Sequence, residues 1–170
     1  MKSFKEYLVE STKVIGYHGT NVLFDKFDPD SVGRNNHINT NGRNNNDKRG
    51  FFFVSDERDA KSAAKAVYRD AGGTTVTYKC ELTLNNPYTL KQFYQTVGTE
   101  KGEKIYNETG GAGWGIFDLY KDIILKDVDA GGYDSIKFRH QGVDFLVVFD
   151  VNQINIIDRD EFAFNDWRSR

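Results

Sequence analysis

The most regular stretch of the chain is Val76-Thr77-Tyr78-Lys79-Cys80-Glu81-Leu82-Thr83-Leu84. Apolar or aromatic residues occupy every second position, and Thr, Lys and Glu fill the positions between them. An alternation with a period of two is typical of a β-strand that buries one face. Asn86-Pro87 follows and would end the strand, because proline has no backbone N–H to donate.

Further strands and helices are expected on both sides of this stretch. The β-rich runs are residues 13–17, 50–55, 133–138 and 144–150. The helical patterns are residues 56–68, which Asp56 would cap and Gly72-Gly73 would end, residues 90–97 and residues 116–129. Residues 110–115 read as a linker around a packed Trp114. This mixture of strands and helices predicts an α+β fold.

Composition narrows the class of protein. The chain has 170 residues, of which 38% are hydrophobic and 28% charged, so it has the size and the core of one domain. Its net charge of −2 argues against a general nucleic-acid binder. No apolar run approaches the roughly 18 residues of a membrane span, so no membrane partner is expected. Cys80 is the only cysteine, and with three His in the chain no metal site is expected.

Residues 1–10 allow two interpretations. Phe4, Tyr7 and Leu8 recur at helical spacing, which is typical of a short amphipathic helix packed on the domain. The segment also resembles the capsid-targeting peptides of internal head proteins in tailed bacteriophages. That resemblance rests on the Met-Lys start and on Leu8-Val9-Glu10. It implies cleavage by a prohead protease after Glu10, a single domain over residues 11–170, and a location in the phage head interior before injection into the host cytoplasm.

Three short motifs, in order along the chain, carry the functional signal. They are Tyr17-His18-Gly19-Thr20, Gly50-Phe51-Phe52-Phe53-Val54 with the Ala-rich helix after it, and Val147-Val148-Phe149-Asp150 followed by Gln153-Ile154. In this order they resemble the ADP-ribosyltransferase superfamily of the diphtheria-toxin and PARP type, above all its small phage versions. The resemblance runs from about Val14 to Ile157. It implies a split β-sandwich of two mainly antiparallel sheets around an NAD cleft.

The resemblance assigns roles to the first two motifs. His18 would hydrogen-bond a ribose hydroxyl of NAD, and the backbone of Gly19 would take the carboxamide, where a close approach favours a residue without Cβ. Tyr17 and Thr20 complete that NAD-binding turn. Phe52 stands in the place of the stacking Tyr of the family, where it keeps the ring and loses the hydroxyl. The alternative for His18 is a buried histidine with a structural role.

Three further positions would contact NAD by the same resemblance. Ser62 lies near the place of a hydroxyl donor to the carboxamide, and Lys65 replaces the second stacking aromatic. Tyr68, one turn further along the helix, would substitute for that aromatic. The Asn-rich segment 33–49 falls where the family has a loop over NAD, so Arg49 would meet the pyrophosphate. Tyr68 and Ser62 could instead be ordinary helix residues.

The position of the catalytic carboxylate is open. Counting back from the last motif puts the Glu of the family on Phe145, and the nearest acid is Asp144, one residue earlier. A shift by one residue turns a strand side chain to the other face unless a β-bulge corrects it. Asp144 is therefore one candidate, and Gln141, another acid such as Asp134, or no catalytic acid at all are the alternatives.

The resemblance implies a mono-ADP-ribosyltransferase that uses NAD as a substrate. Its target would be a host macromolecule, foremost a protein, modified during phage infection. Without the Glu, elongation to poly-ADP-ribose is not expected. The alternatives are a domain of the same fold that binds NAD, ADP-ribose or a host defence protein without turnover, and an internal head protein with no chemistry.

Overall fold

The computed structural model describes residues 11–31 and 49–164. The N-terminal segment 1–10 and nearly all of the segment 33–49 lie outside the described residues. The described strands are β1 (Thr12–Thr20), β2 (Phe51–Val54), β3 (Val76–Leu84), β4 (Pro87–Thr89), β5 (Ser135–His140), β6 (Val143–Val148) and β7 (Ile154–Glu161). The α-helices are α1 (Glu57–Ala71), α2 (Leu90–Val97), α3 (Thr99–Thr109) and α4 (Gly113–Gly131), and two short 3-10 turns are η1 (Pro29–Ser31) and η2 (Val151–Gln153).

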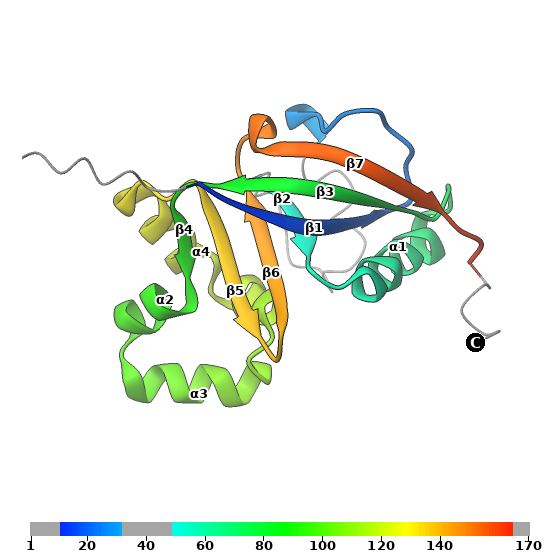
Figure 1. The fold of residues 1–170 in the computed structure, drawn as a ribbon. Helices are drawn as coiled ribbons and strands as arrows, with labels where there is room; N and C mark the ends of the chain where they lie inside the picture. The colour runs from blue at the N-terminus through cyan, green and yellow to red at the C-terminus, as the bar shows by residue number, and fades with distance from the viewer. Residues whose placement is uncertain (1–10, 32–48, 165–170) are drawn as a thin grey trace, which may run out of the picture.

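All seven strands belong to one hydrogen-bonded sheet in the order β4-β5-β6-β2-β1-β3-β7. Only β4 and β5 run parallel, and the other neighbours are antiparallel. β1 and β2 pair through a single pair of residues, Tyr17 with Val54, whereas β1 and β3 pair along their whole length. The sheet thus has a long arm of β1, β3 and β7 and a short arm of β4, β5, β6 and β2. The strands of the two arms run in clearly different directions (Figure 1).

The predicted α+β class is confirmed, and several elements match their expected limits. β3 begins and ends at the predicted residues, α2 covers the predicted 90–97, and Asp56 caps α1 by accepting a hydrogen bond from the backbone N–H of Arg58. In place of two separate sheets, the strand pairing joins the two arms into one sheet.

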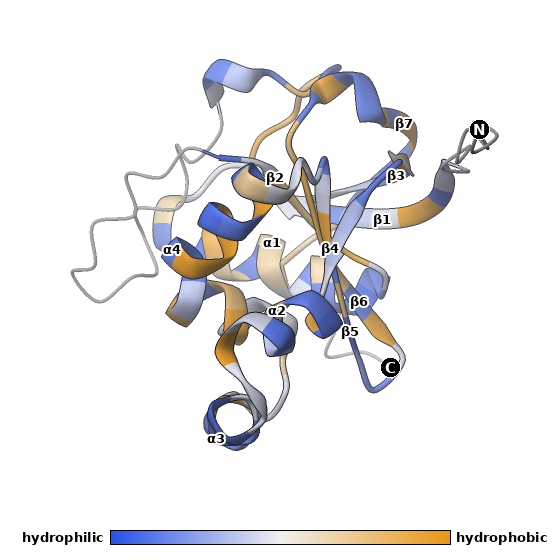
Figure 2. Cartoon of the chain, turned by 90° about the vertical axis from the view of Figure 1, so that its left-hand side faces the viewer, coloured by the Kyte–Doolittle hydropathy of each residue, from blue (hydrophilic) through white to orange (hydrophobic). Residues whose placement is uncertain are grey.

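The linker predicted at residues 110–115 is shorter in the structure, where only residues 110–112 lie between α3 and α4. α4 already begins at Gly113, and Trp114 is 66% exposed rather than packed. Glycine is required at position 113 because a Cβ there would lie 2.7 Å from the Cβ of Phe145. Only a residue without a side chain allows the helix to approach β6 this closely. α3 and β7 had no prediction. Most of their residues are exposed, and α3 is largely hydrophilic and lies at the edge of the molecule (Figure 2).

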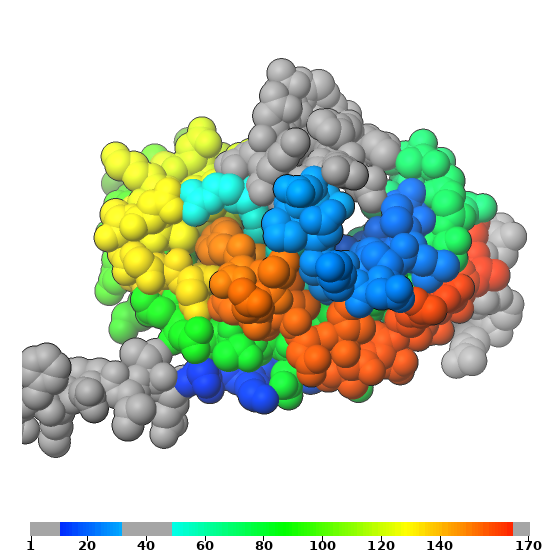
Figure 3. Space-filling view, turned by 90° about the horizontal axis from the view of Figure 1, so that it is seen from above, coloured from blue at the N-terminus to red at the C-terminus, as the bar shows by residue number. Residues whose placement is uncertain are grey.

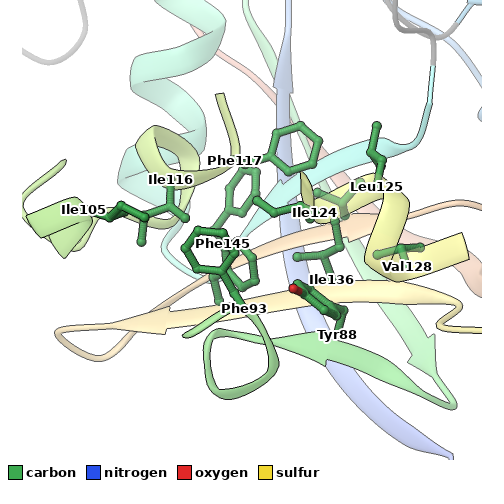
Figure 4. Close-up of a cluster of buried hydrophobic side chains, with 12 residues drawn as sticks. Tyr88, Phe93, Ile105, Ile116, Phe117, Ile124, Leu125, Val128, Ile136 and Phe145 are labelled. Atoms are coloured by element: carbon green, nitrogen blue, oxygen red, sulfur yellow. The ribbon is translucent and has the colours of Figure 1, made fainter. Parts of the chain in front are cut away.

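Two cores lie on opposite faces of the sheet. Helices α2, α3 and α4 bury one core against the short arm, with Phe93, Ile124 and Phe145 among its members (Figure 4). The second core lies along the long arm and joins Phe53, Tyr78 and Leu82 to Phe27, from the segment between β1 and η1. We call the first side the helical face and the second the loop-covered face. Figure 3 views the molecule from above and shows the chain around η1 lying beside the chain around η2.

Gly19 fixes the position of α1 on the helical face. A Cβ at Gly19 would lie only 1.8 Å from the backbone oxygen of Ala60 and 3.0 Å from the backbone nitrogen of Ala64. Both alanines are buried against the strand. The helix therefore approaches β1 as closely as backbone atoms allow, and the sequence permits this because both surfaces lack large side chains.

We expect Gly19→Ala to lower the free energy of unfolding by about 3 kcal/mol or more, because the added methyl meets backbone that cannot move aside. Gly115→Ala is the matched control, since its Cβ would have no neighbour closer than 3.6 Å. This helical position should change by less than about 1 kcal/mol, in the stabilising direction. Urea denaturation of both variants measures the difference, and equal stabilities would contradict the packing described.

Candidate active site

His18 is held by a hydrogen bond that crosses from one arm to the other. Its Nδ1 lies 2.8 Å from the backbone oxygen of Phe52 in β2. The ring is half-buried on the loop-covered face, with its centroid 5.3 Å from that of Phe27 and 5.7 Å from that of Phe53. His18 therefore lies where the two arms meet, and both arms fix the orientation of its ring.

This hydrogen bond determines the chemistry of the imidazole. A carbonyl oxygen only accepts, so Nδ1 must carry the proton and donate it. Burial lowers the pKa of His18 below its usual 6.5, and the bond to the Phe52 carbonyl opposes this more weakly. The ring is therefore neutral at neutral pH, and Nε2 presents a lone pair. In the described part of the chain Nε2 has no hydrogen-bond partner, so it can accept a hydrogen bond from a hydroxyl of a ligand.

Asp144 lies on the same face of the sheet as His18. In β6, Phe145 pairs with Val54 and Leu146 pairs with Phe53, which places Phe145 on the helical face and Asp144 on the loop-covered face. Only β2 separates β6 from β1, so at the rung of Tyr17, Val54 and Phe145 the outer two backbones are roughly 10 Å apart at the usual strand spacing. The acid one residue before the expected position thus reaches the face of His18 without a β-bulge in β6.

The carboxylate of Asp144 is not a free negative charge. Its Oδ1 lies 3.2 Å from Nη1 of Arg139, and its Oδ2 lies 3.8 Å from Nζ of Lys137. Its backbone N–H donates to the hydroxyl of Ser55 at 2.8 Å. The side chain is only 10% exposed, whereas that of Arg139 is 64% exposed. Two cations therefore balance Asp144 before any substrate binds.

The other residues of the first motif divide between the two faces. Tyr17 and Gly19 point to the helical face, where α1 lies over Gly19, because successive strand residues alternate. Thr20 shares the loop-covered face with His18 and is buried. A ligand on the loop-covered face can meet His18 there, but the side chain of Tyr17 lies on the opposite side of the sheet.

The two predicted stacking rings are packed against other aromatic residues. The ring of Phe52 lies 5.4 Å from that of Phe117, on the helical face, and is part of the first core. The ring of Tyr68 lies 5.4 Å from that of Phe164, beyond the end of β7. Ser62 is exposed, and its hydroxyl donates to the carbonyl of Arg58 one turn earlier. The structure does not bring these three side chains together around His18.

The remaining residues predicted for the site either bind other protein groups or lie in an exposed turn. Arg49 makes a two-pronged ion pair with Asp129, with nitrogen–oxygen distances of 2.9 and 2.7 Å. Gln141 is exposed at the turn between β5 and β6, where its φ is +48°. Asp134, the alternative acid, accepts hydrogen bonds from the backbone N–H groups of Asn85 and Asn86 and belongs to a structural network.

Two groups of site residues had no sequence prediction. Phe24 and Phe27 pack on the ring of His18, and Phe24 also stacks on Tyr78 with centroids 4.1 Å apart. Their spacing of three residues before Pro29 was visible, but nothing placed them against His18. Lys137 and Arg139 were detectable as same-face residues of a strand, because they are two positions apart.

In the described residues, no group of three or more His, Cys, Asp or Glu side chains is placed to hold a metal ion. No helix among them is both long enough and apolar enough to cross a membrane.

A bent sheet with a neutral histidine at the junction of its arms, and an acid on the same face, defines an α+β domain of the ADP-ribosyltransferase type. A family model described as "ADP-Ribosyltransferase in polyvalent proteins" matches residues 11–164, so the chain belongs to that family. Neither the comparison with curated proteins nor the comparison with solved structures gave a match.

The state of His18 can be tested by NMR. We expect long-range proton–nitrogen spectra to show the neutral tautomer protonated on Nδ1, with a titration midpoint below 6.5. Because the pKa of the folded state is lowered, the unfolded chain takes up this proton first. The stability due to His18 is thus fully present above about 6.5 and is lost as the pH falls through the lowered pKa.

The control for this test is His18→Asn, whose amide can still donate to the Phe52 carbonyl but does not titrate. Its free energy of unfolding should depend less on pH below 6.5 than that of the unchanged protein. A tautomer protonated on Nε2 would show that the hydrogen bond to Phe52 is misassigned. A midpoint at or above 6.5 would show that burial does not outweigh that bond.

Proposed function

We propose that this domain transfers a single ADP-ribose from NAD to a macromolecular acceptor. The observation that carries the proposal is the neutral His18, whose Nδ1 is fixed by the Phe52 carbonyl and whose Nε2 is left as an acceptor. A ribose hydroxyl is a donor of the kind that such an acceptor holds. Membership of the ADP-ribosyltransferase family supports the same reaction class.

In this reaction the protein itself has to transfer few protons. In the transfer, the bond between nicotinamide and ribose C1′ breaks, and nicotinamide leaves with the electron pair. A nucleophilic atom of the acceptor bonds to C1′ and loses its proton to solvent. Positive charge grows on the ribose in the transition state, as in glycoside hydrolysis, so a carboxylate nearby stabilises it. His18 would orient the ribose, and Asp144 is the acid on its face.

The two ion pairs of Asp144 favour a second candidate function. Lys137 and Arg139 offset the charge that would stabilise the transition state, and the predicted stacking rings pack elsewhere. A domain with this arrangement could bind NAD or ADP-ribose, or contact a host defence protein, without turnover. For Asp144 to stabilise the transition state, the approaching substrate must weaken the ion pair between Asp144 and the exposed Arg139.

Incubation of the protein with labelled NAD and a bacterial lysate separates the two candidates. We expect labelled macromolecules with the unchanged protein and none with His18→Ala, because the ribose loses its acceptor. Asp144→Asn keeps the shape and removes the charge, so labelling should slow by about a hundredfold or more. Its affinity for NAD should change little, since the charge matters most in the transition state.

Asp122→Asn is the matched control, because Asp122 is exposed on α4 and has no hydrogen bond in the described structure. It should label at the normal rate. Normal labelling by His18→Ala would contradict the site. If the unchanged protein labels nothing while NAD still raises its melting temperature, the binding function holds instead.

We further propose that residues 1–10 direct the chain into the head of a tailed phage and are removed there by the prohead protease. The support is the resemblance of Leu8-Val9-Glu10 to cleavage motifs in such peptides, and the family match that begins at Ser11. The acceptor would then be a host macromolecule met after injection into the bacterial cytoplasm. In the alternative, the chain serves as an internal head protein.

N-terminal sequencing of the protein from purified virions tests this proposal. We expect the mature chain to begin at Ser11, and a recombinant protein lacking residues 1–10 to keep its melting temperature. An intact Met1 in virions would exclude cleavage, and unfolding of the shortened protein would favour a packed N-terminal helix.

A further inference from the structure

A pocket of about 150 Å³ opens on the helical face of the long arm, on the side of the sheet opposite to His18. Two adjacent rungs of the sheet form its floor, one made of Tyr17, Lys79 and Asp158 and the other including Thr77 and Asp160. Glu57, in the first turn of α1, and Arg159 complete its lining. A register irregularity between β3 and β7 falls at Lys79, beside the pocket. Such bulges are frequent next to binding sites.

The pocket contains polar groups that the protein itself does not satisfy. Thr77 is only 2% exposed, yet its hydroxyl has no hydrogen-bond partner among the described residues. The Tyr17 hydroxyl and the Lys79 ammonium likewise have no partner in that part of the chain. All three residues line the pocket, where water or a bound ligand can supply the hydrogen bond that the protein does not.

The charges around the pocket determine the chemistry of that ligand. The carboxylates of Glu57 and Asp160 share the ammonium of Lys61, at 2.9 and 2.8 Å. Asp158 accepts the backbone N–H of Arg159 and keeps further acceptor capacity, and Lys79 supplies a cation across the floor. An anion would meet three carboxylates, and a cation would meet the ammonium of Lys79. The site therefore favours a neutral ligand that both donates and accepts hydrogen bonds.

The volume of the pocket limits the size of the ligand. About 150 Å³ leaves room for one small ring. Hydroxyl groups suit the lining, because each can donate to Asp158 or Asp160 and accept from Lys79, Thr77 or Tyr17. We propose that this pocket binds a neutral polyhydroxylated ring of pentose size, either as a free sugar or as the sugar of a nucleoside. The site does not depend on the proposed transferase reaction, because it lies on the other face of the sheet.

Titration with D-ribose and with adenosine, followed by backbone NMR, tests the proposal and separates the two sources. We expect saturable shifts at Thr77, Lys79 and Asp158, with no matching shifts at His18. Thr77→Val keeps the shape and removes the hydroxyl, so it should weaken binding by about fivefold or more, the effect of one lost hydrogen bond. Lys79→Met removes a second donor and should weaken binding independently.

Thr83→Val is the matched control, because Thr83 lies on the same strand and the same face but outside the pocket. Its affinity should equal that of the unchanged protein. Binding of adenosine without binding of D-ribose would identify a nucleoside as the source. The proposal fails if neither compound gives saturable shifts, if Thr77→Val and Lys79→Met both bind normally, or if glutamate or putrescine occupies the pocket in their place.

Discussion

The carboxylate of Asp134 ties together three segments that meet where the long arm passes into the short arm. It accepts hydrogen bonds from the backbone N–H groups of Asn85 and Asn86 after β3, and from the Gln153 amide before β7. Gln153 also donates to the carbonyl of Thr83 at 2.9 Å. Burial alone would raise the pKa of Asp134, but the hydrogen bonds from Asn86, Asn85 and Ser135 outweigh it and lower the pKa below its usual value. The negative charge of Asp134 is thus stabilised by the same segments that the carboxylate connects.

Besides this network, the single pair of Tyr17 with Val54 joins the two arms. The register that continues from this pair into β6 puts His18, on the long arm, and Asp144, on the short arm, on the same face of the sheet. The same geometry separates Tyr17 from His18, because neighbours on one strand face opposite ways. One bent sheet therefore offers two unlike polar sites, one at the junction of the arms and one beneath the first turn of α1.

Local patterns predicted the elements whose residues alternate clearly or carry a cap. β3 shows a strict period of two, and Asp56 marks the start of α1, so both were found from sequence. β7 was missed because it is an edge strand with charged, exposed residues on both faces of the sheet. These residues hide the alternation of apolar and polar positions. α3 was missed because it buries only Gly102 and Ile105, too few for a helical stripe.

The site could be predicted only in part, since its chemistry depends on contacts between distant segments. The motif located His18, but its protonation follows from Phe52, 34 positions away. Counting along the last motif pointed to Phe145, and only the pairing of β6 with β2 shows that Asp144 faces His18. The ion pair of Arg49 with Asp129 joins residues 80 positions apart, and no local pattern reports such a pair.

The two outer strands of the sheet have a consequence for association between chains. β7, at one edge, carries Asp158, Arg159, Asp160 and Glu161 in succession, so a strand added there would bring its backbone against a row of charges. β4, at the other edge, has only three residues and starts with Pro87. It therefore offers very little backbone with which another strand could pair. Sheets with blunted edges of this kind resist the edge-to-edge growth that leads to fibrils. Pairing of either outer strand with a strand of a neighbouring chain is therefore disfavoured.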